Sequence, residues 1–127
     1  MTSELILIDT SAWIDFFRDR EPVSSLVDTA LAEGRAALCG MIDLEIRQGL
    51  RPGEDHILQM LQATHRIPTK EADYALAGDL LASLRRRGIT LPGSDGLIAH
   101  LALRHALPLL ENDGHFTHLP DLWRLRS

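Results

Sequence analysis

The chain has 127 residues, 45% of them hydrophobic, and this length and composition predict one globular domain over residues 1–127 with a sizeable core. The formal net charge of -5 argues against a protein that coats polyanions over its whole surface, although a local basic patch is compatible with it. The single cysteine, Cys39, excludes an internal disulfide, and no apolar run resembles an export signal or a membrane span. The cytoplasm is the expected compartment.

Four consecutive apolar residues near the start of the chain, 5–8, predict a strand covered on both faces, as in a parallel sheet. Asp9 ends this run, and Thr10 and Ser11 are the candidate N-caps of the helix that follows. The spacing of apolar residues and the positions of Pro and Gly predict further elements. Helices are expected over 12–18, 23–33, 41–50 and 54–63, and a strand over 36–39.

The second half opens with the longest predicted helix, 69–87, in which Ala72, Leu76, Leu80 and Leu84 recur every four residues. Ser94 is expected to cap a helix over 95–105, which a strand over 107–110, a turn at 112–114 and an edge strand over 122–125 follow. Because strand, helix and strand return the chain parallel to itself, these elements predict an α/β fold with helices on both faces of a mainly parallel sheet.

Four carboxylates occupy positions that favour a common site. Asp9 and Asp113 follow the ends of two predicted strands, while Glu45 and Asp95 lie on helix faces that are otherwise apolar or small. Each also has a simpler interpretation: Asp95 as first-turn charge, Asp113 as a turn residue, and Glu45 as a partner of Arg47 or Arg51. The other aspartates are expected to be solvated: Asp15, Asp19, Asp28, Asp43, Asp55, Asp73, Asp79 and Asp121.

If the four acids converge, their mutual repulsion has to be offset. Two like charges about 4 Å apart cost about 1 kcal/mol in water and about 4 kcal/mol in a partly buried site. Protonation or a bound cation relieves this repulsion, and an all-oxygen ligand set favours Mg²⁺ or Mn²⁺ over Zn²⁺. Such an ion suits the hydrolysis of phosphate esters.

The order of these motifs along the chain resembles the PIN-domain ribonucleases, and within them the VapC toxins of toxin-antitoxin pairs. The resemblance rests on the ordered set rather than on any single motif, and it covers nearly the whole chain. The motifs are Leu-Ile-Asp-Thr-Ser-Ala-Trp-Ile-Asp near the start, Leu-Glu-Ile-Arg-Gln-Gly around Glu45, Ser-Asp-Gly-Leu-Ile-Ala-His around Asp95, and Asn-Asp-Gly-His-Phe around Asp113.

The resemblance implies a three-layer α/β/α sandwich whose acidic site binds Mg²⁺ or Mn²⁺ and cleaves single-stranded or loop RNA. It puts four acids on the family's acidic positions: Asp9, Glu45, Asp95 and Asp113. It also implies that Ser11 helps to hold the first acid and that Asn112 neighbours the site. The chain departs from the pattern at His115, where many relatives carry a further acid, so a fifth carboxylate and a second metal position are in doubt.

The same resemblance implies partners. These are an RNA substrate, a second copy of the chain, and a VapB-like antitoxin whose C-terminal segment lies in an apolar groove. The helix that carries Trp13, Phe16 and Phe17 is either a wall of that groove or plain core. Phosphate contacts are expected from arginines, since the site itself is acidic. The candidates are Arg18, Arg47, Arg51, Arg85, Arg86 and Arg87.

Three other functions stay open from the sequence. The first is a PIN-type RNA-processing nuclease without an antitoxin. The second is a phosphotransferase with Asp9 as nucleophile, which the Ser at position 11 disfavours because enzymes of the haloacid-dehalogenase type carry a second Asp there. The third is a non-catalytic domain whose acids bind a structural ion or a basic peptide.

Overall fold

A sheet of five parallel strands forms the centre of the structure, a computed structural model that describes residues 4–112, 114–119 and 124–125. The strand order is β3-β2-β1-β4-β5, so β1 lies in the middle. Because all the strands run in the same direction, their carboxyl ends lie at one edge of the sheet. The strands are β1 Ile6–Ile8, β2 Ala36–Leu38, β3 His65–Arg66, β4 Leu109–Leu110 and β5 Arg124–Leu125.

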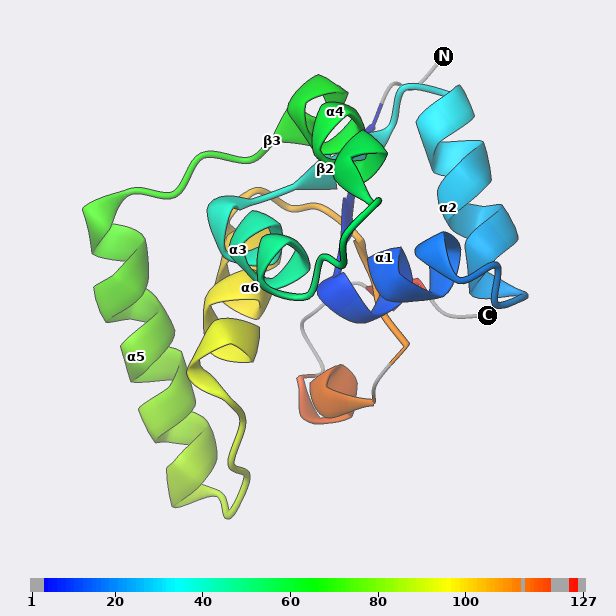
Figure 1. The fold of residues 1–127 in the computed structure, drawn as a ribbon. Coiled ribbons are helices and arrows are strands. Elements are labelled where there is room, and N and C mark those ends of the chain that lie inside the picture. Colours follow the sequence, from blue (N-terminus) through cyan, green and yellow to red (C-terminus); the bar gives the residue numbers. More distant parts are fainter. Residues whose placement is uncertain (1–3, 113, 120–123, 126–127) are drawn as a thin grey trace.

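Helices cover both faces of this sheet and make the fold a three-layer α/β/α sandwich (Figure 1). Helices α5 and α6 pack together on one side, and α1 and α2 pack together on the other, while α3 contacts both α1 and α6. The predicted fold class is therefore confirmed. No helix in the described part of the chain has the length and apolar content to cross a membrane. The helices are α1 Thr10–Phe17, α2 Val23–Ala32, α3 Gly40–Gln48, α4 Asp55–Ala63, α5 Glu71–Arg86, α6 Gly93–Arg104 and the 3-10 helix η1 His115–His118.

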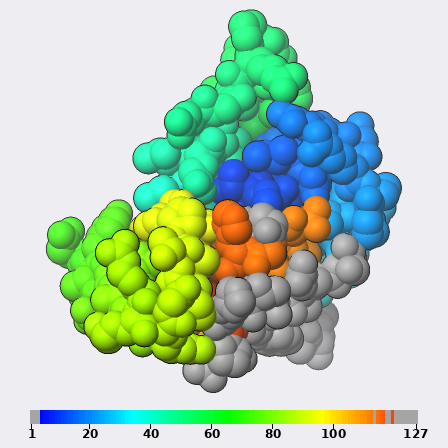
Figure 2. Space-filling view, turned by 90° about the horizontal axis from the view of Figure 1, so that it is seen from below, coloured from blue at the N-terminus to red at the C-terminus, as the bar shows by residue number. Residues whose placement is uncertain are grey.

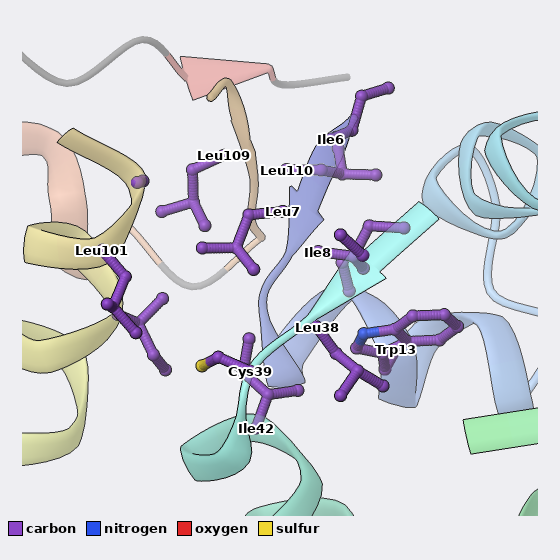
Figure 3. Packing of buried hydrophobic residues seen from close by; sticks show 14 of the residues in the cluster. Ile6, Leu7, Ile8, Trp13, Leu38, Cys39, Ile42, Leu101, Leu109 and Leu110 are labelled. Carbon is purple, nitrogen blue, oxygen red and sulfur yellow. The ribbon is translucent and has the colours of Figure 1, made fainter. Parts of the chain in front are cut away.

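The core lies where the central strands meet the two helical layers (Figure 3). Leu7 and Ile8 of β1 are fully buried, as is Cys39, which directly follows β2. A strand covered on both faces needs apolar side chains at every position, and this explains the lack of alternation in residues 5–8. Trp13 of α1 is also fully buried, with Phe17 stacked against it at a ring distance of 6.1 Å. Trp13 is therefore core rather than the wall of an open groove.

The described boundaries of the predicted helices and strands agree with the structure to within two residues, but two helix starts are capped differently. Helix α1 is capped by Asp9 rather than by Thr10 or Ser11, because Asp9 stays extended while its N–H donates to Leu110 O at 2.9 Å. Helix α6 already begins at Gly93, so the predicted cap at Ser94 is wrong. Its N-cap is Pro92, whose ring holds the extended conformation that precedes the helix.

Two features of the middle of the chain were not predicted. Strand β3 has only two residues, both exposed at the sheet edge, so it carries no hydrophobic pattern. In α5 the buried stripe runs through Asp73, Ala77 and Leu84, whereas Leu76 is 49% exposed. The prediction that Asp73 is solvated is wrong, because partners on α6 supply the hydrogen bonds that its buried carboxylate needs.

Candidate active site

The carboxyl ends of β1, β2 and β4 form the edge of the sheet where the predicted site residues gather. Asp9 directly follows β1, Cys39 follows β2, and Glu111 and Asn112 follow β4. Figure 2 shows the first part of α1 (dark blue) surrounded on this face by α3 (teal), α6 (yellow) and the segment after β4 (orange). Four segments that are distant in the sequence therefore share one surface, as expected for the ligand site of a parallel α/β sheet.

Asp9 is held by its own helix and by the segment after β4. Its side chain is only 2% exposed, and Oδ2 accepts hydrogen bonds from Ser11 Oγ at 2.7 Å and from Ser11 N at 3.3 Å. Ser11 Oγ in turn accepts a hydrogen bond from the backbone N–H of Asn112 at 3.1 Å. Ser11 thus links the carboxylate of Asp9 to the chain beyond β4.

Glu45 reaches the same edge from α3. Its Oε1 accepts a hydrogen bond from Thr10 Oγ1 at 2.7 Å, which places the carboxylate beside the N-terminus of α1. Burial raises the pKa of the Cys39 thiol most, backbone hydrogen bonds with Ile42 and Met41 lower it, and the negative charges of Asp9 and Glu45 raise it. Since Glu45 is half-buried against α1, the alternative of a pairing at the rim with Arg47 is not what the structure shows: Arg47 pairs with Asp43.

Asp95 is the third predicted acid that the structure describes. It lies in the first turn of α6, is 7% exposed, and forms a hydrogen bond with Nδ1 of His115 in η1. The contact brings His115 to the carboxylate of Asp95. The fourth acid, Asp113, lies outside the described residues.

The donor set at this edge fits a hard divalent cation by its chemistry. Asp9, Glu45 and Asp95 offer carboxylate oxygens, the ligands that Mg²⁺ and Mn²⁺ prefer. Within residues 4–112, 114–119 and 124–125 no group of three or more His, Cys, Asp or Glu side chains is arranged as a metal centre. The predicted ligand set extends beyond those residues, because it includes Asp113.

The structure adds a buried acid that the sequence interpretation passed over. Glu111 is 1% exposed and directly follows β4, and its Oε2 accepts a hydrogen bond from Gly114 N at 3.2 Å. Gly114 has a φ of +75°, a conformation that glycine adopts without strain, so the carboxylate closes a tight turn after β4. The signal was present: Glu111 ends an apolar run just as Asp9 does.

Asp15 is a second acid whose place was wrongly predicted. It was expected to be solvated but is 7% exposed, and its Oδ2 accepts a hydrogen bond from Asn112 Nδ2 at 2.6 Å. It lies four residues after Ser11, so the two side chains share one face of α1. That spacing is the sequence signal that could have placed Asp15 beside the site.

The candidate phosphate-binding arginines differ in how free they are. Arg47 Nε lies 2.6 Å from Asp43, which Arg66 also contacts at 2.8 Å. Burial raises the pKa of Asp43, but the two arginines together lower it more, so the carboxyl stays ionised. Arg47 is therefore held in an ion pair with Asp43. By contrast, Arg85 and Arg86 are exposed and line a cavity of about 510 Å³ between the end of α5 and the start of α6.

Comparison with known proteins agrees with this architecture. The family model of the PIN domain matches residues 6–122, which is most of the chain. The protein therefore belongs to the PIN-domain family. The structure agrees with this membership, because it has buried acids at the carboxyl edge of a parallel sheet.

Within the family the chain is similar to VapC proteins. It is 30% identical to VapC ribonuclease Mb1587 of Mycobacterium bovis and to Ribonuclease VapC11 of Mycobacterium tuberculosis, with 97% of each chain covered. Its fold matches VapBC2 from Rickettsia felis, a structure bound to a promoter DNA fragment, with a TM-score of 0.78 at 16% identity over 97% of this chain and 98% of that chain. VapBC-1 from nontypeable Haemophilus influenzae matches with a TM-score of 0.77 at 16% identity over 96% and 97% of the two chains.

Proposed function

We propose that this protein is a VapC-type toxin, a metal-dependent endoribonuclease that cleaves phosphodiester bonds in structured transfer, ribosomal or messenger RNA and so restrains translation in the cytoplasm. The VapC ribonucleases to which it is similar over 97% of both chains support this class of activity. The observation that carries the proposal is that Asp9 and Glu45, from separate elements, are both hydrogen-bonded to the first residues of α1, Asp9 through Ser11 and Glu45 through Thr10.

The acids have two parts in the proposed chemistry. Asp9, Asp95 and Asp113 would hold Mg²⁺ or Mn²⁺ directly or through waters, with Ser11 fixing the orientation of Asp9. Glu45, held by Thr10, orients the attacking water. When bound, a hard cation supplies Lewis-acid stabilisation of the phosphate and lowers the pKa of water. In-line attack then leaves a 5′-phosphate and a 3′-hydroxyl.

RNA is the proposed substrate, with contacts to its backbone from arginines outside the acidic edge. Arg85 and Arg86 are the best placed of the candidates, because they are exposed beside the start of α6, the helix that carries Asp95. Figure 2 shows the end of α5 and the following loop (yellow-green) on the same face as α6. Arg18 and Arg87 are also exposed and remain candidates. Sequence preference would come from unpaired bases in loops.

The proposed partners are a VapB-like antitoxin and a second copy of this chain. Several solved structures with this fold are VapBC complexes, which supports an antitoxin for this protein as well. Phe16 and Phe17 of α1 remain partly exposed and are the side chains available to line an antitoxin groove. Co-purification with the product of the adjacent gene, and relief of growth arrest by it, would separate a toxin from an RNA-processing nuclease.

Replacing Asp9 by Asn tests the proposed site. The substitution keeps the shape of the side chain but removes a charged oxygen ligand. We expect cleavage of transfer and ribosomal RNA to fall by more than about a hundredfold. Mutating a residue that only hydrogen-bonds to a metal ligand already lowers metal affinity or activity by about 10–100-fold. Mn²⁺ should raise the melting temperature of the wild type but not of the variant, because only the intact site binds the ion.

The control for this experiment is Asp28→Asn, at an exposed position on α2, which changes the net charge equally. It should cleave RNA at the wild-type rate, and a chelator should stop cleavage by both. If purified Asp9→Asn protein cuts RNA as the wild type does, the assignment of the site is wrong.

A further inference from the structure

A chain of hydrogen bonds runs from α1 to the segment after β4 and ends on the first catalytic acid. Asp15 Oδ2 accepts from the side chain of Asn112 at 2.6 Å, and the backbone N–H of the same asparagine donates to Ser11 Oγ at 3.1 Å. Ser11 Oγ then donates to Asp9 Oδ2 at 2.7 Å. Asn112 thus makes two hydrogen bonds to one face of α1, through its side chain to Asp15 and through its backbone to Ser11.

The burial of Asp15 distinguishes its hydrogen bond with Asn112 from an ordinary hydrogen bond at the surface. The residue is 7% exposed, and carboxylates are rarely buried unless they are paired. Within the described part of the chain the cation that pairs with it is Arg20, whose Nη1 lies 3.7 Å from Oδ1 on a side chain that is 57% exposed. A pair of that length in solvent contributes little. The short bond from Asn112 is therefore the main interaction that offsets the desolvation of Asp15.

The segment that Asp15 holds is the one that carries the rest of the predicted site. Residues 111–116 include Glu111, Asp113 and His115, and they follow a strand of only two residues. Such a short strand does little to define the path of the chain beyond it. The two hydrogen bonds of Asn112 hold the chain after β4 against α1. One of them joins it to Ser11, the same serine that orients Asp9.

We propose that Asp15 is a positioning residue: it holds Asn112 and thereby fixes the segment after β4 against the catalytic carboxylate of Asp9. This inference rests on the proposed nuclease function for its effect on catalysis. Its structural part does not, because the order of residues 111–116 can be measured without any substrate.

The experiment compares three variants in hydrogen exchange: Asp15→Ala, Asn112→Ala and Asp15→Asn. We expect Asp15→Ala to speed exchange of the Asn112 and Gly114 amides by about tenfold or more, with the exchange of α6 unchanged, because only the local contact is lost. Asn112→Ala removes the same bond from an exposed residue, so it tests the proposal even if Asp15→Ala folds poorly. Asp15→Asn keeps a neutral acceptor and should lie between the wild type and Asp15→Ala.

Cleavage kinetics supply the second readout. With an oligoribonucleotide substrate we expect both alanine variants to lower kcat by about tenfold to a hundredfold with KM within about twofold, because a misplaced segment harms the reaction more than phosphate binding. The double variant should be no slower than either single variant, since both remove one interaction. Asp28→Ala is the matched control and should leave exchange and kcat unchanged.

The outcomes separate the two proposals. If the amides of residues 112 and 114 exchange at the wild-type rate in both alanine variants, or if the double variant loses activity additively, the positioning role of Asp15 is wrong. If the wild type itself shows no metal-dependent cleavage, the proposed function fails, while the exchange data still decide whether Asp15 holds the segment.

Discussion

At the scale of single residues, Asp73 shows how a buried charge joins two helices. It is 2% exposed at the start of α5 and accepts a hydrogen bond from Lys70 N at 2.7 Å. Two residues of α6 complete its shell: His100 Nε2 at 2.8 Å and Arg104 Nε at 2.6 Å. The Lys70 N–H lowers the pKa of Asp73 most; burial acts in the opposite direction, and His100 and Arg104 lower the pKa further.

This lowered pKa predicts a pH dependence of stability. Because the folded pKa of Asp73 lies below the ordinary value of about 4, its contribution is fully present above that pH and is lost as the pH falls through the folded pKa. The melting temperature of Asp73→Asn should therefore be lowest relative to the wild type above about pH 5, and the gap should narrow below about pH 4. Asp79→Asn, exposed on the same helix, should show no such gap.

At the scale of elements, α5 and α6 approach each other closely at Gly96. A Cβ built on Gly96 would lie 2.5 Å from Leu81 Cγ and 2.6 and 2.7 Å from its two methyl carbons. These distances are shorter than any normal carbon contact, so a side chain at position 96 would require the Leu81 side chain between the two helices to move.

Gly96→Ala should therefore destabilise the protein. Overpacking costs about 1–3 kcal/mol, against about 1 kcal/mol gained from the better helix propensity of alanine. Gly78→Ala is the matched control, because it lies within α5 and no atom comes within 4 Å of its added Cβ. Gly78→Ala should raise the melting temperature and Gly96→Ala should lower it. Equal shifts in one direction would contradict the close approach of the helices.

At the scale of the whole molecule, charge decides how the protein meets RNA. A net charge of -5 repels a polyanion, so binding has to come from a local group of arginines. Arg85 and Arg86 form such a group beside the start of α6, whereas Arg47 and Arg66 are bound to Asp43. The two sets have the same charge but differ in their freedom to contact phosphate.

This difference predicts how RNA binding responds to salt. In an Asp9→Asn background, which prevents cleavage, Arg86→Ala should weaken RNA binding and reduce the slope of log K against log salt by about 0.7, the value for one phosphate contact on a single strand. Arg66→Ala changes the net charge equally and should leave the slope unchanged. Filter binding over a salt series measures both, and equal slopes for the two variants would exclude the α5 arginines as the contact site.

Much of the fold was predictable from the sequence because its signals are local. The apolar run at 5–8, the helical spacing of the longer helices and the positions of Pro and Gly depend on residues a few positions apart. Asp9, Glu45 and Asp95 could be singled out for the same reason, since Asp9 follows an apolar run and the other two lie on helix faces that are otherwise apolar or small. The order of these motifs was enough to indicate the PIN-domain family, which the match over residues 6–122 confirmed.

Only the tertiary structure decided which other acids are buried. Asp15 bonds a residue 97 positions away, and Asp73 bonds residues 27 and 31 positions away. Local spacing can place Asp15 on the same helix face as Ser11, but it does not show that either carboxylate is buried. A carboxylate enters the interior when its partners are brought to it, because those hydrogen bonds offset the loss of water. The sequence therefore determined the elements and the principal acids, whereas the folded chain determined what holds those acids in place.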